Sequence, residues 1–222
     1  LRVSGSGFGM RTTVLLDGPL GGGRVTGLNI PISLRPTRDP LAGCVKSGFR
    51  AVEIGGLHLA AASLNVCLSG SEARLAPVRL AGRLGESPIQ LAANGARIGF
   101  SRGDFAVDSL GVKLGPPDRL SLLDVAALTG RFGEGRAHGK FSGASGAIGN
   151  VPLKMSEGSG AWQFANSKLM LQGGLRVSDG LATDPRFNPL FVDRFSLQFA
   201  NNIILASGVA REPKTLAQVA EL

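Results

Sequence analysis

The sequence predicts a mostly β protein, a bent antiparallel sheet with few or no helices. Apolar residues recur at every second position in runs from one end of the chain to the other, and this is the period of a strand. Glycine supplies 33 of the 222 residues, and glycine is unfavourable inside a helix. Dipeptides that favour turns, among them Asp-Gly, Gly-Gly and Asn-Gly, separate many of the runs.

The stretch GGGRVTGLNIPISLRP shows the alternation most clearly. Its apolar residues Leu28, Ile30, Ile32 and Leu34 alternate with polar residues and with Pro31. One face of this strand is therefore expected to be apolar and the other polar. Because proline cannot donate a hydrogen bond to a neighbouring strand, Pro31 predicts an edge or an irregular rim of the sheet.

Further runs predict strands along most of the chain. Asp17-Gly18, Gly55-Gly56 and Asn94-Gly95 predict tight turns, and Asn-Gly is a strong signal for a two-residue hairpin. Residues 120–128 and 215–222 fit a short helix or a strand equally well. The expected strands are 11–17, 24–35, 44–54, 57–68, 89–93, 96–100, 105–114, 161–166, 168–177 and 195–205, the last interrupted by Asn201-Asn202.

Residues 130–160 are the least structured by pattern. Glycine alternates there with small and apolar residues, which predicts either a flexible region or a tightly turning sheet with little side-chain volume. No stretch reaches the roughly 18 apolar residues of a membrane-spanning helix, and no leader peptide is visible. Since both ends of the sequence fall inside a patterned stretch, we expect residues 1–222 to be one segment of a longer protein.

The parity of the apolar residues predicts that one face of the sheet is apolar. Several runs change parity midway: Leu57 and Leu59 are odd, whereas Leu64 and Val66 are even, and the run 105–114 behaves in the same way. Such a change indicates a bulge or kink, and repeated kinks bend a sheet into a trough or a sandwich. The apolar side of the last runs is expected to hold Leu169, Leu171, Leu175, Val177, Phe195, Leu197, Phe199, Ile203 and Leu205.

The charge of the chain is strongly basic, with a formal net charge of +8. Proteins that bind nucleic acids usually cluster their basic residues and add aromatic residues for stacking. Here the basic residues are scattered singly, aromatic residues make up only 5% of the chain, and tyrosine is absent. We therefore expect a solvated basic surface and no nucleic-acid partner.

No set of residues predicts catalysis. The two histidines, His58 and His138, have no partner at a spacing typical of metal or catalytic sites. The glycine-rich stretches GSGFG and GPLGGGR lack the Lys-Ser/Thr that follows a phosphate-binding loop, and the carboxylates are scattered. We expect no enzymatic activity, no cofactor and no metal site.

The two cysteines leave two possibilities open. Cys44 and Cys67 lie in runs joined by a short Gly-Gly connection, so antiparallel pairing could bring them within disulfide range. Two buried free thiols fit the spacing equally well.

A long apolar surface without a recognisable catalytic or ligand-binding set of polar residues is compatible with two functions. It could be the closed core of a structural or adhesive β domain that carries no lipid. It could also line an open groove that holds lipids, since burying an acyl chain releases about 0.8 kcal/mol for each CH₂ without any specific polar site.

Several stretches resemble the YdbH branch of the AsmA-like proteins, which are long envelope proteins of Gram-negative bacteria. They are LDGPLGGGRVTGLNIPISLRP, GCVKSGFRAVEIGGLHLAAASLNVCLSG, GEGRAHGKFSGASGAIGNVPLKMSEGSGAWQF, DPRFNPLFVD and NNIILASGVAREPKTLAQVAEL. The resemblance implies an elongated β-groove, a sheet folded like a taco, that is anchored in the inner membrane and crosses the periplasm. It implies passive movement of phospholipids between the inner and outer membranes along the apolar lining, and no catalytic residues.

The same resemblance gives roles to particular residues. A periplasmic setting favours a disulfide between Cys44 and Cys67. Phospholipid acyl chains are the implied partners of the groove. The residues expected to line it are Leu28, Ile30, Ile32, Leu34, Leu169, Leu171, Leu175, Phe195, Leu197 and Phe199.

Overall fold

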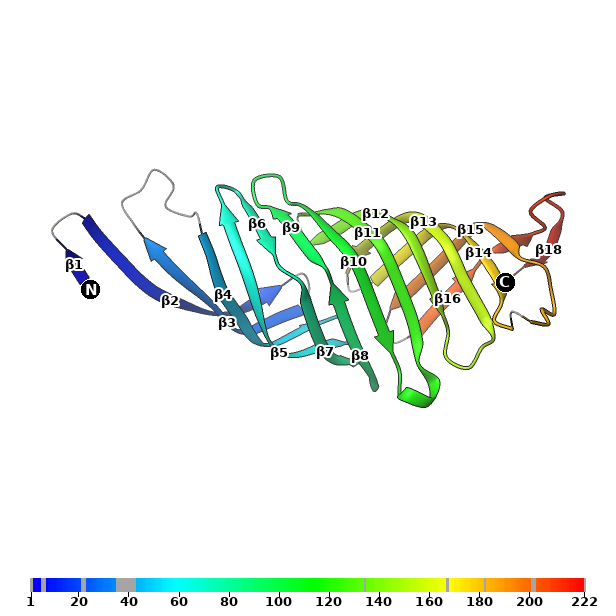
Figure 1. Cartoon of the computed structure of the whole chain (residues 1–222), viewed down its shortest axis with the longest axis horizontal. Coiled ribbons are helices and arrows are strands. Elements are labelled where there is room, and N and C mark those ends of the chain that lie inside the picture. The colour runs from blue at the N-terminus through cyan, green and yellow to red at the C-terminus, as the bar shows by residue number, and fades with distance from the viewer. Residues whose placement is uncertain are drawn as a thin grey trace.

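The computed structural model of the chain is a β sheet that extends along the whole molecule (Figure 1). It describes residues 2–4, 7–20, 23–34, 43–133, 135–166, 168–181, 183–200 and 203–221. Within these ranges the only helical element is a 3₁₀ turn, Pro117–Arg119, and no helix is long and apolar enough to cross a membrane. The predicted fold class, a mostly β protein with a bent antiparallel sheet, is confirmed.

The strands follow one another in chain order. Residues 120–128 and 215–222, which could have been helix or strand, contribute β11 and β18. The bounds are β1 Arg2–Ser4, β2 Gly7–Leu20, β3 Gly23–Leu34, β4 Gly43–Ile54, β5 Leu57–Ser69, β6 Glu72–Leu75, β7 Val78–Leu84, β8 Ser87–Ala93, β9 Gly95–Gly99, β10 Asp104–Leu114, β11 Ser121–Gly133, β12 Arg136–Ala147, β13 Leu153–Ala165, β14 Lys168–Asp179, β15 Leu190–Ala200, β16 Ile203–Ser207, β17 Val209–Arg211 and β18 Gln218–Glu221.

Most strands pair antiparallel with their neighbours in the sequence. Three long strands pair with two shorter ones that follow each other along the chain: β5 pairs with β6 and β7, β10 with β8 and β9, and β15 with β16 and β17. Each of these pairs of short strands therefore acts as one long strand interrupted near its middle. The Gly-rich residues 130–160 also form strands, namely β12 and parts of β11 and β13.

The interruptions and bends of successive strands lie side by side. Ser109 of β10, Gly143 of β12 and Glu157 of β13 have φ angles of 52°, 63° and 55°, in the left-handed region. The registers of β12 with β13, and of β13 with β14, shift at these same positions. A left-handed residue or a bulge changes the direction of a strand, so the aligned bends form one crease along the sheet. The kink predicted in the run 105–114 is confirmed.

The crease divides the sheet into two walls. In Figure 1 the strands of one wall cross the front of the molecule and other parts of the same sheet pass behind them. The part of the sheet that contains Val45, Val107 and Leu128 is called the first wall. The part that contains Leu91 and Val112 is called the second wall.

Two of the three predicted turns are wrong. Asn94-Gly95 joins β8 to β9, and both of these pair with β10, so the chain continues in one direction instead of reversing. A type I′ hairpin needs positive φ at both central residues, and neither residue has it. Asp17-Gly18 lies inside β2, where the Asp17 carboxylate accepts a hydrogen bond from the N–H of Gly27 at a bulge in β3. The hairpin at Gly55-Gly56, with φ of 55° and 84°, is confirmed.

Pro31 lies in β3 opposite Thr13 of β2. The register between β3 and β4 ends earlier, at Asn29 and Gly48. Pro31 therefore lies in a part of β3 that pairs with β2 and lies beyond the register with β4. This agrees with the irregular edge that Pro31 predicts.

The molecule exposes far more surface than a compact protein of its size. Its accessible surface is 14413 Å², whereas a compact monomer of 22.9 kDa exposes about 9,600 Å². Its densest packing is a cluster of Phe49, Val52 and Leu59 on β4 and β5, against which Leu80 and Leu91 pack from β7 and β8. The sheet is thus a single layer that is packed well only locally.

Replacing Phe49 with alanine is expected to lower the free energy of unfolding by about 3 kcal/mol, because the ring fills the centre of this cluster. Lys46→Ala, on the same strand but exposed, is the matched control and is expected to change stability by less than about 0.5 kcal/mol. Urea unfolding followed by circular dichroism measures both. Equal stability of the two variants would show that the cluster does not hold the walls together.

Candidate functional site

The most extensive chemical feature of the chain is the inner face of the bent sheet. Residues directly opposite each other on antiparallel strands point to the same face, so the register defines rows that cross the sheet. We call three of them the inner rows. The first inner row is Val45, Val66, Leu75, Ala96, Val107, Leu128, Phe141, Gly160, Gly173 and Phe195.

The other two inner rows have the same character. The second lies on the first wall, farther from the crease, and is Leu68, Ala73, Ile98, Phe105, Gly130, Gly139, Trp162, Leu171, Leu197 and Ala206. The third lies on the second wall and is Leu80, Leu91, Val112, Leu123, Gly146, Met155, Val177 and Leu190.

The inner rows contain only apolar residues and glycine, and nearly all of them are buried or half-buried. The row on the opposite face, between the first and second inner rows, is mostly exposed and includes three basic residues. Its members are Cys44, Cys67, Arg74, Arg97, Ala106, Thr129, Lys140, Ala161, Gln172, Ser196 and Ser207. Among the described residues, the apolar face is therefore the more buried of the two.

Glycines within the inner rows make room for aromatic rings. Phe105 and Trp162 are separated in their row by Gly130 and Gly139, yet their ring centroids are 5.7 Å apart. A Cβ atom on Gly130 would lie 2.6 Å from the Trp162 ring, so no larger residue fits there. The Trp162 Nε1–H also donates a hydrogen bond of 3.1 Å to the Thr129 carbonyl oxygen, which fixes the ring over the glycines.

Six of the ten residues predicted to line a groove lie together on β14 and β15. Leu169 is opposite Phe199, and Leu171 is opposite Leu197. Phe195 is opposite a glycine and Leu175 is opposite Val192. All six are half-buried, so their side chains keep part of their surface accessible.

The other four predicted residues lie near the opposite end of the sheet, on β3. Leu28 is opposite Leu16 and Ile30 is opposite Val14 of β2, and both are half-buried. The backbones of Ile32 and Leu34 continue β3, but their side chains lie outside the described part of the chain. The prediction therefore falls on two separate regions of one sheet.

Two residues expected on the apolar side lie on the other face. Ile203 pairs with Ala200 and Leu205 pairs with Gln198, so these side chains point away from the inner face and are 60% and 59% exposed. The alternation of β15 does not continue into β16, because β16 runs antiparallel to β15. The central strands that connect the two predicted regions were not singled out either, although the alternation in 105–114 was a usable signal.

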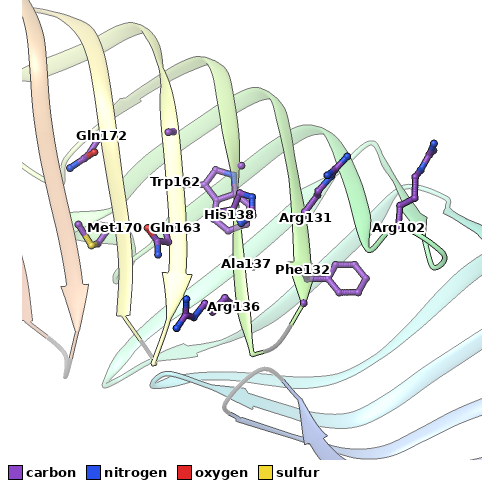
Figure 2. A pocket seen from close by; sticks show the side chains of 13 residues that line it. Arg102, Arg131, Phe132, Arg136, Ala137, His138, Trp162, Gln163, Met170 and Gln172 are labelled. Carbon is purple, nitrogen blue, oxygen red and sulfur yellow. The ribbon is translucent and has the colours of Figure 1, made fainter.

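Near the ends of β11 to β14 the surface is hollowed. Figure 2 shows the residues around this hollow of about 760 Å³. Most of its lining lies on the face opposite the inner rows and includes Arg131, His138, Ala161, Gln163, Met170 and Gln172. Arg102 and Arg136 line it as well, and so do Phe132 and Trp162 of the inner face.

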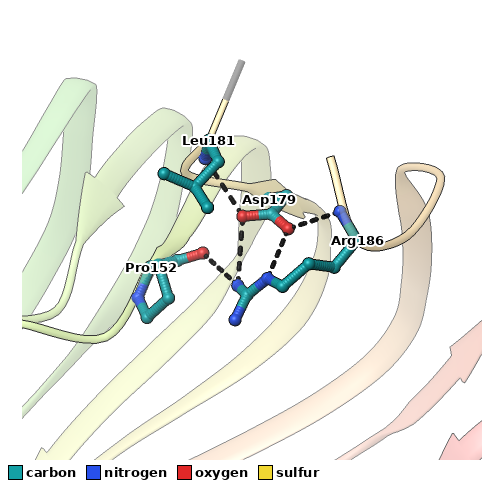
Figure 3. Close-up of polar contacts among 4 residues, drawn as sticks. All are labelled: Pro152, Asp179, Leu181 and Arg186. Carbon is teal, nitrogen blue, oxygen red and sulfur yellow. Dashed lines mark hydrogen bonds and ion pairs between the residues drawn. The ribbon is translucent and has the colours of Figure 1, made fainter. Parts of the chain in front are cut away.

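A second polar feature ties down the connection between β14 and β15. The Arg186 guanidinium donates to the Asp179 carboxylate from Nε (2.7 Å) and Nη2 (3.0 Å), and Nη2 also donates to the Pro152 carbonyl oxygen at 3.1 Å (Figure 3). The N–H groups of Leu181 and Arg186 donate to the same carboxylate. The hydrogen bonds from the Arg186 side chain, and then that from Leu181, hold the pKa of Asp179 well below its ordinary value of 3.8.

Cys44 and Cys67 are register partners on β4 and β5, and their sulfurs form a disulfide with an S–S distance of 2.04 Å. The bond lies on the face opposite the inner rows. In the described part of the chain, no group of three or more His, Cys, Asp or Glu residues is placed to hold a metal ion.

Comparison with known proteins gives no relative: no protein-family model, curated protein or solved structure matches the chain. The resemblance to the AsmA-like proteins remains a prediction from the sequence.

Asp179→Asn is expected to loosen the connection between β14 and β15, because the amide cannot replace the charged acceptor of Arg186. Limited proteolysis with trypsin should then cut faster after Arg186. Asp184→Asn, an exposed residue of the same connection, should leave the rate unchanged.

The same ion pair makes stability depend on pH. Because the folded state lowers the pKa of Asp179, the contribution is fully present above about pH 4 and is lost as the pH falls further. The difference in unfolding midpoint between wild type and Asp179→Asn should shrink from pH 7 to pH 3. A constant difference would mean that this carboxylate is not the titrating group.

Removing the disulfide with Cys44→Ser/Cys67→Ser is expected to lower the free energy of unfolding by about 3 kcal/mol, the chain-entropy value for a loop of this length. The double variant and the wild type with and without reductant are compared by urea unfolding. The variant should match the reduced wild type. Identical curves for oxidised and reduced wild type would show that the bond adds no stability.

Proposed function

We propose that the inner face holds lipid acyl chains, and that the chain is a segment of an envelope protein along which phospholipids move between the inner and outer membranes of a Gram-negative bacterium. The observation that supports this most directly is the continuity of the inner rows. The first inner row crosses ten strands from β4 to β15 without a polar side chain.

The length of the rows suits movement better than a single fixed site. Ten strands have nine spacings of about 4.8 Å, or about 43 Å in all. One leaflet of a bilayer has a hydrocarbon thickness of about 15 Å, so a tail is shorter than the row. A tail that shifts by one strand exchanges one apolar neighbour for another, and no polar group has to be desolvated on the way.

The partial burial of the inner face also supports a guest. Leu169, Leu171 and Leu197 remain half-buried, and the chain exposes about 1.5 times the surface of a compact protein. Covering this apolar surface with acyl chains would contribute about 25 cal/mol for each Å². Such binding needs no recognition of a particular tail.

A structural or adhesive β domain without lipid is the second candidate. One observation favours this second candidate. Leu80 and Leu91 pack against the buried cluster of Phe49, Val52 and Leu59, so that the protein's own side chains occupy this part of the interior. If the whole inner face closed in this way, the chain would carry no cargo. The two functions therefore differ in whether lipid accompanies the purified protein.

Leu171→Asp is expected to reduce the phospholipid bound per protein by about tenfold or more, because a carboxylate in the second inner row would have to be desolvated beside the tails. Ser207→Asp is the matched control, since Ser207 lies in the row on the opposite face, is exposed and does not line the hollow. Lipid is extracted from the purified proteins and measured by mass spectrometry.

Both variants must keep the β circular dichroism and the elongated small-angle scattering profile of the wild type. Wild-type protein purified from a bacterial envelope without any phospholipid would contradict the proposal. Equal lipid in the two variants would show that the second inner row does not contact the tails.

A further inference from the structure

The two long borders of the bent sheet differ in charge. The first rim is the border of the first wall, formed by the connections at 69–72, 99–104, 133–136 and 165–168. The second rim is the border of the second wall, formed by the connections at 54–57, 84–87, 114–121, 147–153 and 179–190. If the tails of a lipid lie on the inner face, its polar headgroup has to lie at one of these rims, where it reaches water.

Hydrogen bonds hold three hairpins of the first rim together. The N–H of Phe100 donates to the Ser71 carbonyl oxygen at 2.8 Å, and the N–H of Phe132 donates to the Gly103 carbonyl oxygen at 2.8 Å. The connections between β5 and β6, between β9 and β10, and between β11 and β12 are therefore fixed relative to one another. These backbone hydrogen bonds hold the side chains of the three connections in fixed positions relative to one another.

Aromatic side chains lie just inside the first rim. The Phe132 ring is 46% exposed and stacks on Phe105 with a centroid distance of 6.3 Å, and Phe105 in turn contacts Trp162. Phe132 starts a fourth apolar row, the one nearest this rim, which continues through Ala137, Phe164, Leu169 and Phe199. The apolar face therefore extends almost to the border.

Basic side chains lie on the other side of the same border. Arg131 and His138 are register partners on the exposed face, two residues from the connection at 133–136, and Arg136 lies in that connection. Together with Arg102 they line the hollow of about 760 Å³ that Phe132 also lines. Among the described residues no Asp or Glu lines it, and Arg102 is paired with Asp104 at 3.4 Å.

Basic and acidic side chains also contact each other at the second rim, as Arg74 and Glu72 (2.6 Å) and Arg102 and Asp104 (3.4 Å) do at the first rim. The nearest N···O distances between the side chains of the second rim are 3.7, 3.2, 3.6 and 2.7 Å. The pairs are His58 with Glu53, Arg83 with Glu86, Arg119 with Asp118, and Arg186 with Asp179. The connections of the second rim hold two basic and four acidic residues, whereas those of the first rim hold three of each, counting Glu134 of the sequence. Arg131 and His138, which lie two residues from the connection at 133–136, add basic groups at the first rim.

We infer that the first rim binds the phosphate of a lipid headgroup while the tails of the same lipid lie on the inner rows, so that phospholipids sit with their headgroups toward this rim. The inference rests on the proposed function, and it adds the place on the sheet where the phosphate of the phospholipid is bound. Guanidinium groups bind phosphate oxygens in bidentate pairs. Aromatic rings beside arginines are also the arrangement that a boundary between hydrocarbon and headgroups favours.

Trp162 provides a direct test, because it is the only tryptophan of the chain and lies in the second inner row beside Phe105. Bromine atoms on an acyl chain quench tryptophan fluorescence on contact. The purified chain is titrated with phosphatidylglycerol and with diacylglycerol that have the same brominated tails. Wild type is compared with Arg131→Gln/Arg136→Gln, and with Arg83→Gln/Arg119→Gln as the matched pair at the second rim.

Removing the two arginines of the first rim is expected to weaken quenching by phosphatidylglycerol about tenfold and to leave quenching by diacylglycerol unchanged. The variant of the second rim should bind both lipids as wild type does. Inorganic phosphate at millimolar concentration should not displace the phospholipid, because most of the binding comes from the tails.

The outcomes separate this inference from the proposed function. If neither lipid quenches Trp162 in the wild type, the proposed function fails together with the inference. If diacylglycerol quenches and phosphatidylglycerol binds wild type and the first-rim variant equally, only the headgroup site is overturned. Displacement of the phospholipid by inorganic phosphate alone would also overturn it, in favour of a simple anion site.

Discussion

The alignment of the strand bends is the constraint on which the rest of the structure depends. A single-layer sheet has two equivalent faces unless it curves, and here successive strands turn at neighbouring positions. Ser109, Gly143 and Glu157 take left-handed backbone angles on β10, β12 and β13, and the registers of the strands shift beside them. Because the bends are side by side, their effects add, and the sheet turns along one line from β10 to β13.

Curvature and composition act together on that face. The inner rows bring apolar side chains from many strands to one face, and glycines such as Gly130 leave space for the Trp162 and Phe105 rings to meet. The result is a surface that is apolar along the direction of strand stacking, instead of a core enclosed on all sides. Around Phe49, Val52 and Leu59 the chain packs its own side chains into a buried cluster.

The main polar features of the described residues lie on the face opposite the inner rows and at the borders of the sheet. The disulfide between Cys44 and Cys67 joins two strands on that face, and the Asp179–Arg186 pair anchors a long connection at the second rim. Arginines gather at the first rim, beside the aromatic end of the inner face. In the proposed complex, the tails of a lipid would contact the apolar inner rows. Its headgroup would meet a different set of charges at the first rim than at the second.

The sequence by itself determined the strand content and the apolar face, because alternation of period two depends only on residues within one strand. It located Leu169, Leu171, Leu197 and Phe199 on one side, and it predicted the kink in the run 105–114. It misassigned Asn94-Gly95, since a turn signal is local, whereas pairing of both β8 and β9 with the long β10 keeps the chain extended.

Only the tertiary structure decided which rows cross the sheet and where charge gathers. Arg102 and Arg136 come from separate hairpins, and no spacing in the sequence links them. Parity counted through Asn201-Asn202 placed Ile203 and Leu205 on the wrong face, because β16 runs antiparallel to β15 and does not continue its alternation. Facing direction within a strand is set by local geometry, but the neighbours of a strand are set by register, which depends on residues far apart in the chain.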